Sequence, residues 1–343
     1  MWWGKGDPVP PLMTTSPADT PRDAAGLLTT SGTQILFGDS GLNRTMHSGG
    51  RFTLDFWSCP YCCSAIEASY FFLGTQSDIF RNSSQGTPIL ARPFFNVQDD
   101  RPDAGLIAFP GVQTGSITAV SSSSFQGTEI LLRRNLVRQP GSKVDVLVGY
   151  RYLRLKDDLR MDEFETFIDP QSVIQVGSTL AITDSFDTLN QFHGVDLGID
   201  AQWRRCCWSL DLVAKLALGN TNSHVSIGGT TTATVPDTAP VVSQGGFLAQ
   251  QTNSGQFSRN WFSMVPELGA TIGYDLDCRR RITVGYSLVY WSKVARPGDQ
   301  IDLNLNPAQF PAPQASTGRG PEFRFATTDF WAQGLSLGLD FRF

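Results

Sequence analysis

The chain has 343 residues, with 27 lysines and arginines against 32 aspartates and glutamates and a formal net charge of −5. It contains no basic helix or Lys/Arg-rich arm, so the sequence gives no reason to expect a nucleic acid as a partner. Glycine is abundant (33 residues), 11% of the residues are aromatic and only 17% are charged, which suits many strands joined by turns better than a helical bundle. No apolar run of about 18 residues occurs, which excludes a transmembrane helix.

The first 31 residues are rich in proline. Pro8, Pro10, Pro11, Pro17 and Pro21 disfavour long regular elements. Residues 1–31 are therefore predicted to form a flexible segment. Residues 32–343 are predicted to form a single domain, and Gly32–Gly38 is the candidate for its first strand.

From Arg51 onward, apolar residues alternate with polar or small ones over segments of about ten residues, the pattern of strands with two different faces. Phe52, Leu54 and Phe56, for example, alternate with Thr53 and Asp55. The alternation recurs in segments that begin at Ile66, Val144, Val195, Trp208, Leu268, Ile282 and Leu335. Nine strands can be counted from Gly49 to Phe343, and Gly32–Gly38 brings the number to about ten, within a range of about eight to twelve.

Two features favour a transmembrane barrel over a soluble sandwich, whose strands also alternate. Aromatic residues gather near the strand ends, where girdles at two membrane interfaces require them. They are Trp57, Tyr70, Tyr152, Trp203, Trp208, Tyr274, Tyr290, Trp291 and Trp331. In addition, short connections alternate with long ones, as short periplasmic turns and long extracellular loops do. The short ones lie near Ser58–Ser64, Asn135–Lys143, Arg204–Cys207 and Leu276–Arg281, and the long ones near Gly74–Ser123, Leu155–Gln191, Gly219–Asn260 and Ser292–Thr328.

The sequence therefore predicts an all-β transmembrane antiparallel β-barrel of about ten strands in residues 32–343, located in a bacterial outer membrane. Residues 1–31 then lie in the periplasm. Gly228–Thr234 is expected to form either extended β-structure above the membrane or a mobile surface loop. An exported protein needs a secretory signal, which Met1–Pro8 lacks, so we interpret the chain as mature or trimmed. The terminal Phe343 fits the aromatic residue that the barrel-assembly machinery commonly recognises at the end of the last strand.

Charged residues occupy the polar face of these strands, which a barrel turns towards its lumen. The predicted lumen-facing residues are Asp55, Glu67, Glu129, Arg133, Asp145, Arg151, Asp196, Asp200, Asp211, Lys215, Glu267, Asp340 and Arg342. A barrel of about ten strands has a narrow lumen that side chains can largely fill, and buried charges must pair. We therefore expect a salt-bridged interior first and a narrow, cation-preferring channel second.

Six cysteines lie at or beside short turns and are predicted at the periplasmic rim: Cys59, Cys62, Cys63, Cys206, Cys207 and Cys278. Disulfides between neighbouring turns are expected in an oxidising periplasm, ahead of free thiols or a metal site. Arginines gather at the same turns: Arg133, Arg134, Arg204, Arg205, Arg279, Arg280 and Arg281. They are interpreted as ordinary polar turn residues ahead of contacts with lipid phosphates or cell wall.

The sequence gives little support for an enzymatic function. The only histidines are His47, His193 and His224, and only His193, near Asp184 and Asp187, could begin a catalytic site. No nucleotide fingerprint, phosphate loop or nucleophile elbow occurs. We therefore expect no enzyme activity, no cofactor and no metal.

Several longer motifs appear in a specific order along the chain. They are Trp2–Leu12, Leu36–Asp39, Gly49–Leu54, Pro88–Asn96, Gly149–Leu153, Asp184–Thr188 followed by Phe192–Gly194, Arg296–Ile301 and Asp329–Leu335. With these motifs in this order, the chain resembles the Putative beta-barrel porin-7 family. Members of this family are outer-membrane β-barrel proteins found mainly in planctomycetes. The resemblance implies an outer-membrane barrel, whereas the word "porin" in the family name is an inference from architecture.

The function expected from the sequence is a porin-like channel for small polar solutes or ions. The alternative is a structural or adhesive surface barrel with a salt-bridged, plugged lumen. Partners expected in either case are outer-membrane lipids and the barrel-assembly machinery, with small solutes or surface partners reached through the long loops.

Overall fold

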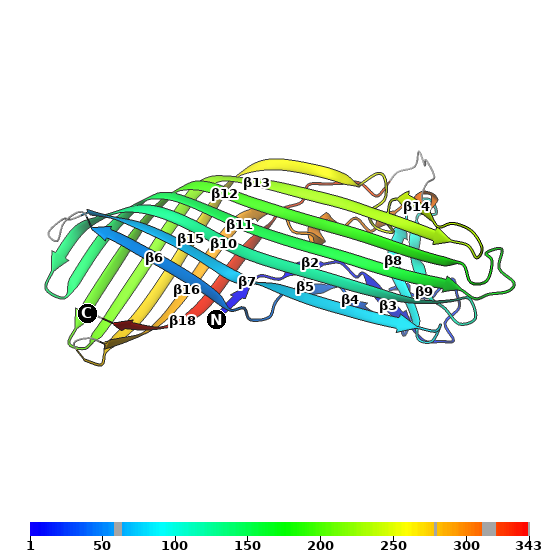
Figure 1. The fold of residues 1–343 in the computed structure, drawn as a ribbon, viewed down its shortest axis with the longest axis horizontal. Coiled ribbons are helices and arrows are strands. Elements are labelled where there is room, and N and C mark those ends of the chain that lie inside the picture. The colour runs from blue at the N-terminus through cyan, green and yellow to red at the C-terminus, as the bar shows by residue number, and fades with distance from the viewer. Residues whose placement is uncertain (58–63, 278–279, 311–319, 342–343) are drawn as a thin grey trace.

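The computed structural model describes residues 1–57, 64–277, 280–310 and 320–341. In these residues one long antiparallel sheet curls into a barrel-like trough (Figure 1). Its main strands are β1 (Trp2–Gly4), β6 (Gly49–Trp57), β7 (Ser64–Ser84), β10 (Gln113–Gln139), β11 (Ser142–Phe167), β12 (Thr179–Arg205), β13 (Trp208–Thr234), β15 (Gly255–Asp275), β16 (Arg280–Val294) and β18 (Thr328–Phe341). They follow the order β1-β18-β16-β15-β13-β12-β11-β10-β7-β6, and β14 (Val241–Gln244) pairs with β13 beside this path. These ten strands confirm the predicted all-β antiparallel architecture.

Four neighbouring strands are much longer than a bilayer requires. β10, β11, β12 and β13 have 27, 26, 27 and 27 residues, whereas about 9–11 residues suffice for a transmembrane strand. Much of the sequence that was predicted as long loops is therefore strand. β11 continues to Phe167 before the chain returns in β12 at Thr179, and the whole of Gly228–Thr234 belongs to β13.

The two faces of β11 exchange their polarity along the strand. In the half nearer the hairpin turns, outward Val148 and Tyr150 are exposed and inward Arg151 is buried. Farther along, inward Leu159 is buried and apolar, while the side chain of outward Arg160 is 60% exposed. Successive side chains still point to opposite faces, so only the surroundings change. The first half has the polarity of a strand in lipid and the second half that of a sheet in water.

The outward apolar residues of the first half form a continuous band around the curled sheet. Exposed members are Phe52, Leu54, Phe56, Ile66, Ile130, Leu132, Val148, Val195, Leu197, Ile199, Leu210, Leu212, Leu268, Ile272, Ile282, Val284, Leu337 and Leu339. Exposed aromatic residues border it: Trp203, Trp208 and Tyr274 near the hairpin turns, and Tyr70, Tyr150 and Tyr286 on the opposite side. Amphipathic rings at both borders agree with the predicted aromatic girdles. We call this surface the apolar band.

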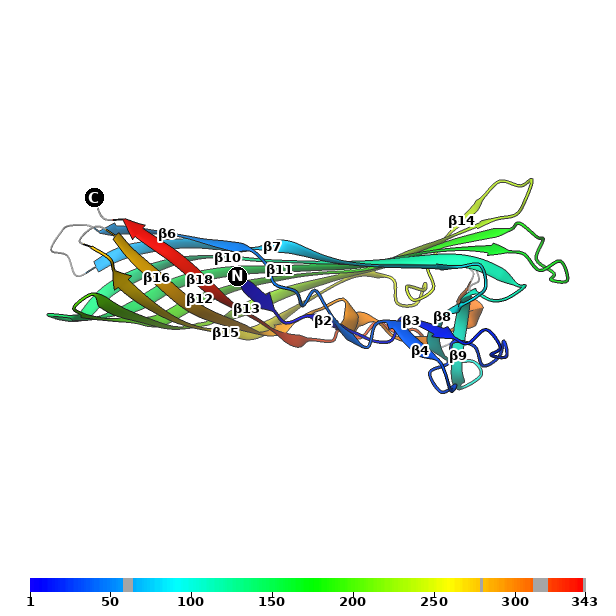
Figure 2. The ribbon, with the colours of Figure 1, turned by 90° about the horizontal axis from the view of Figure 1, so that it is seen from below.

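A smaller sheet covers the concave face of the long strands beyond the apolar band (Figure 2). It consists of β17 (Asn304–Leu305), β8 (Ile89–Asn96), β3 (Met13–Ser16) and β4 (Gln34–Phe37) in this order, with β9 (Arg101–Ala108) paired to β8. The remaining elements are the pair β2 (Asp7–Val9) and β5 (Ser40–Leu42) and two short 3-10 turns, η1 (Gly298–Gln300) and η2 (Pro307–Gln309). Leu12, Phe186 and Leu248 belong to the apolar core between the layers. The outer parts of β10–β13 together with this covering are called the extended lobe.

Residues 1–31 differ from the flexible segment that their prolines predicted. Trp2 in β1 lies opposite Gly334 in β18, and β3 pairs with β4 and β8. The prolines permit this because only Pro8 lies within a strand, in a two-stranded pair where a missing N–H is tolerated. Buried Leu12 and Met13 then hold the segment in the core.

The tenth position in the main sheet is also filled differently from the prediction. Gly32–Gly38 was expected to be the first barrel strand, but Gln34–Phe37 forms β4 of the smaller sheet. β1 takes the place beside β18 instead. The backbone N–H of Trp2 also donates to the carbonyl of His47 at 2.9 Å, and the N–H of His47 donates back at 2.8 Å. β1 therefore bridges β18 and the segment just before β6, the two ends of the curled sheet.

A substitution within the apolar band tests its contact with lipid. Leu212→Arg on β13 is expected to lower the free energy of unfolding by about 2–4 kcal/mol, because an outward charge at mid-band must leave water. Ser226→Arg, on the same face of β13 but in the extended lobe, is the matched control and is expected to cost less than about 0.5 kcal/mol. Urea unfolding from lipid vesicles measures both, and equal costs would contradict the assignment of the band.

Candidate functional site

The inward face of the barrel carries two layers of charged side chains. The layer nearer the hairpin turns, called the turn-end layer, is centred on Arg133, whose guanidinium contacts Glu67, Asp145 and Asp200. Its Nη1 atom lies 2.9 Å from Asp145 Oδ2, and Lys143 Nζ lies 2.6 Å from the same oxygen. Arg133 and Asp200 keep 13% and 18% of their side-chain surface exposed, so water reaches this layer.

The second layer, called the middle layer, is almost completely buried except for Arg51, whose side chain is 30% exposed. It consists of Arg51, Arg151 and Lys215 with Glu129, Asp196 and Glu267. Arg151 reaches all three carboxylates, each at 2.7 Å, and only 2% of its side chain is exposed. Lys215 Nζ lies 2.6 Å from Glu129, and Arg51 lies 2.9 Å from Glu267. Three cations therefore face three carboxylates, which balances the charge where desolvation makes an unpaired ion costly.

An apolar layer lies next to the middle layer, on the side of the extended lobe. It contains Phe71, Leu73, Phe125, Leu153, Leu155, Phe192, Val265, Val289, Trp291 and Phe330. The ring centroids of Phe125 and Phe330 lie 5.0 Å apart, and those of Phe125 and Phe71 lie 5.2 Å apart. Phe192 and Trp291 are both 0% exposed. Aromatic rings prefer such edge-to-face packing, and each side chain of this layer named here is at most 6% exposed.

Trp291 was predicted to belong to an aromatic girdle, and this prediction was wrong. It shares the inward face of β16 with the buried Val289, and its indole N–H donates to Thr221 Oγ1 at 2.9 Å. The prediction considered its place near a strand end but not its parity along the strand, and parity decides which face a residue occupies.

Glycines on the inward face make room for these large side chains. A Cβ atom on Gly127 would lie 2.4 Å from the ring of Phe71 and 2.5 Å from Leu153. A Cβ atom on Gly198 would lie 2.8 Å from the stem of Lys215. The high glycine content of the strands is thus tied to close packing inside the lumen.

Ten of the thirteen predicted lumen-facing residues face the interior. Nine of them lie in the two charged layers, and Asp211 forms an ion pair with Arg281. The ten are Glu67, Glu129, Arg133, Asp145, Arg151, Asp196, Asp200, Asp211, Lys215 and Glu267. Asp55 is exposed and, within the described part of the chain, forms no ion pair. The side chain of Asp340 and the whole of Arg342 lie outside the described residues.

Four arginines of the interior were missed by the sequence analysis. Arg281 was assigned to a turn, but it points inward and pairs with Asp211 at 2.9 Å. Arg51 was not counted although it shares the parity of Asp55, so parity could have found both. Arg92 and Arg296 are each 1% exposed and lie in segments predicted as loops, where no period was available to place them.

The predicted rim sites are described only in part. Cys206 and Cys207 lie in the turn between β12 and β13, and both are exposed free thiols, so no disulfide is found at this turn. Cys59, Cys62, Cys63 and Cys278 lie outside the described residues, as does the proposed assembly signal Phe343.

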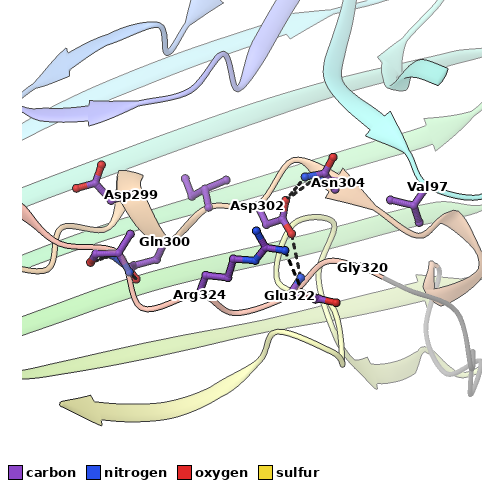
Figure 3. Close-up of a pocket in the computed structure, with 10 residues that line it drawn as sticks. Val97, Asp299, Gln300, Asp302, Asn304, Gly320, Glu322 and Arg324 are labelled. Atoms are coloured by element: carbon purple, nitrogen blue, oxygen red, sulfur yellow. Dashed lines mark hydrogen bonds and ion pairs between the residues drawn. The ribbon is translucent and has the colours of Figure 1, made fainter. Parts of the chain in front are cut away.

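A pocket of about 410 Å³ opens in the extended lobe beside η1 (Figure 3). Two of its carboxylates, Asp302 and Glu322, have polar partners within the chain. Asp302 accepts hydrogen bonds from the backbone N–H groups of Asn304 and Glu322, both at 2.9 Å, and Arg324 lies 3.4 Å from Glu322. Within the described ranges no group of three or more His, Cys, Asp or Glu residues is arranged to hold a metal ion.

Removing the central cation of the middle layer tests how much this layer contributes to the free energy of unfolding. Arg151→Met is expected to lower the free energy of unfolding by about 3–5 kcal/mol, because it leaves buried carboxylates uncompensated. Arg160→Met is the matched control, since Arg160 lies on the outward face of the same strand in an exposed pair with Asp162, and it is expected to cost at most about 1 kcal/mol. Denaturant unfolding followed by tryptophan fluorescence measures both. Similar losses for the two variants would show that the middle layer is not closed to water.

Comparison with known proteins places this architecture in a family. In the described residues, no helix has the length and hydropathy to cross a bilayer. No curated protein matches the chain. Among solved structures, the outer membrane protease OmpT from Escherichia coli is similar over 82% of this chain and 84% of its own, with 7% identity and a TM-score of 0.32. The family model described as Putative beta barrel porin-7 (BBP7) matches residues 1–343, and the chain therefore belongs to the Putative beta barrel porin-7 family.

Proposed function

We propose that this protein is an outer-membrane β-barrel with a closed lumen that anchors a rigid lobe outside the cell. The observation that carries the proposal is the burial of the lumen side chains: Arg151 and Phe125 are 1% and 3% exposed. A conducting pore has a continuous lining that is exposed to water, whereas these two side chains are almost completely buried. The proposal corresponds to the structural or adhesive alternative rather than to an open porin.

The orientation follows from the two ends of the sheet. Short hairpin turns face the periplasm in outer-membrane barrels, and long extensions face outward. The apolar band then contacts lipid, and the extended lobe stands in the external medium. Its surface of polar strand residues and loops is the part available to surface partners, with the barrel holding it at a fixed height above the membrane.

A porin-like channel for small polar solutes or ions is the second candidate, favoured by the turn-end layer. Asp200 and Asp211 keep 18% and 20% of their side-chain surface exposed, so this end resembles a wet, acidic vestibule. Passage from there would require the middle layer and the apolar layer to move together. The ion pairs of Arg151 and the packing of Phe125 both oppose such a movement.

We propose no catalytic role. His193 was the one histidine considered for catalysis, but it lies on the outward face of β12 against the ring of Tyr152, at 5.0 Å between centroids. Asp184 is 0% exposed on the inward face of the same strand. Asp187 is six residues away along the strand, which corresponds to roughly 20 Å. These groups cannot form an acid–base pair in this arrangement.

Conductance in a planar bilayer tests the proposal. The refolded full-length protein is inserted under a salt gradient, with a porin of known conductance as the positive control and circular dichroism to verify folding. We expect a folded but electrically silent barrel. Discrete steps that favour cations would contradict the closed lumen and restore the channel as the function.

A further inference from the structure

A second cavity, of about 760 Å³, lies in the extended lobe between the inner face of the long strands and the smaller sheet. Three aromatic rings line one side of it. Phe247 packs edge-to-face against Phe94 and Phe310, with centroid distances of 5.6 and 5.7 Å. Leu180 and Ile182 of β12 contribute apolar surface from the long strands. The volume is within the range that holds small organic ligands, about 300–1,000 Å³.

The polar end of this cavity is acidic. Glu163 and Glu165 both line it, and since they are two residues apart on β11 they share its inward face. They are 5% and 6% exposed. Ordinary surface carboxylates are mostly exposed, so two carboxyl groups this deeply buried require compensation.

Arg92 is the cation that forms ion pairs at this acidic end. Arg92 Nη1 lies 3.0 Å from Glu163 and 2.9 Å from Asp184. Asp184 also accepts hydrogen bonds from the backbone N–H groups of Leu248 and Ala249, both at 2.9 Å. Among the residues that the structure describes, Glu165 forms no ion pair. The guanidinium of Arg92 therefore pairs with Glu163 and Asp184, and the third buried carboxyl group, Glu165, borders the cavity without such a pair.

Glu165 is far from the bilayer. It lies 15 residues beyond Tyr150, which borders the apolar band on β11, and this corresponds to roughly 50 Å along the strand. In this aqueous lobe, burial and the neighbouring Glu163 hold the pKa of Glu165 well above its usual range. The same burial and the neighbouring carboxylate favour the protonated form of this group, and Arg92 opposes them in part.

We propose that this cavity binds an apolar ligand that carries one amine, with its ammonium group at Glu165 and its apolar part against Phe94 and Phe247. The ammonium supplies the cation that Glu165 lacks, and it replaces the proton of the carboxyl group. The site is independent of whether the lumen conducts. An apolar anion would add a negative charge to an acidic end and is excluded by the same charge balance.

A matched series of three compounds tests the chemistry of the ligand. Phenylbutylamine, phenylbutanol and phenylbutanoate share one apolar part and differ only in the terminal group. Isothermal titration of the refolded full-length protein in detergent, with detergent-only blanks, is expected to give an affinity for the amine at least about tenfold higher than for the other two. Equal binding of the amine and the alcohol, preference for the acid, or no binding of the amine would overturn the proposal.

Two variants locate the amine. Glu165→Gln keeps the size of the side chain and removes its charge, so it is expected to weaken amine binding by about tenfold or more and to leave the alcohol unchanged. Glu322→Gln is the control, because Glu322 lines the separate pocket of about 410 Å³ and is 60% exposed at its side chain. An amine affinity that is equal in Glu165→Gln and in the wild type would refute the role of Glu165.

The pH dependence gives a further readout. Because the carboxyl group must release its proton to pair with the amine, the affinity for phenylbutylamine is expected to rise with pH until Glu165 is ionised. The charged groups packed around Glu165 are Glu163 on its own strand, Arg92 from β8 and Asp184 from β12. Arg22, Asp23 and Asp103 also line the cavity. In Glu165→Gln the rise should disappear. A flat profile in the wild type would contradict exchange of the proton for the ammonium group.

Discussion

Neutralisation of charge inside a narrow lumen is the constraint on which the rest of this structure depends. The strands that cross the apolar band turn arginine, lysine and carboxylate side chains inward, and a barrel of about ten strands leaves little space for water. Each inward charge therefore needs an opposite charge from a neighbouring strand. Arg151 meets this need by contacting Glu129, Asp196 and Glu267, which come from three different strands. The same contacts hold the curled sheet together from within.

The second constraint is the change of solvent along the long strands. Within the apolar band lipid surrounds the barrel, so its outward face is apolar and its inward face carries the paired charges. Beyond the band the outward face is in water, and the inward face becomes apolar so that the smaller sheet can pack against it. β11 contains both regimes, with Val148 outward in the first and Leu159 inward in the second. The extended lobe is thus a continuation of the barrel wall rather than a set of loops.

The sequence predicted those parts of the fold that a period of two can locate. The strands of the apolar band and ten of the inward charges were found because charged and apolar residues alternate there. The outer parts of β10, β12 and β13 were missed because their outward residues are often small and polar, and the alternation has little contrast. In β11 the outward residues are mostly charged, but inward Asp157, Glu163 and Glu165 interrupt the apolar face. Arg92 meets Glu163 and Asp184 only because the small sheet packs against the long strands. Local sequence contains no signal for such a long-range contact.

A double-mutant cycle between Arg151 and Glu267 tests the central claim of compensation most directly. Free energies of unfolding are measured for the wild type, Arg151→Met, Glu267→Gln and the double variant under the same conditions. If the two charges neutralise each other in a closed lumen, the double variant should lose at least about 1 kcal/mol less than the sum of the single losses. Additive losses, within about 0.5 kcal/mol, would contradict the account, because they would show that water rather than the partner charge solvates each group.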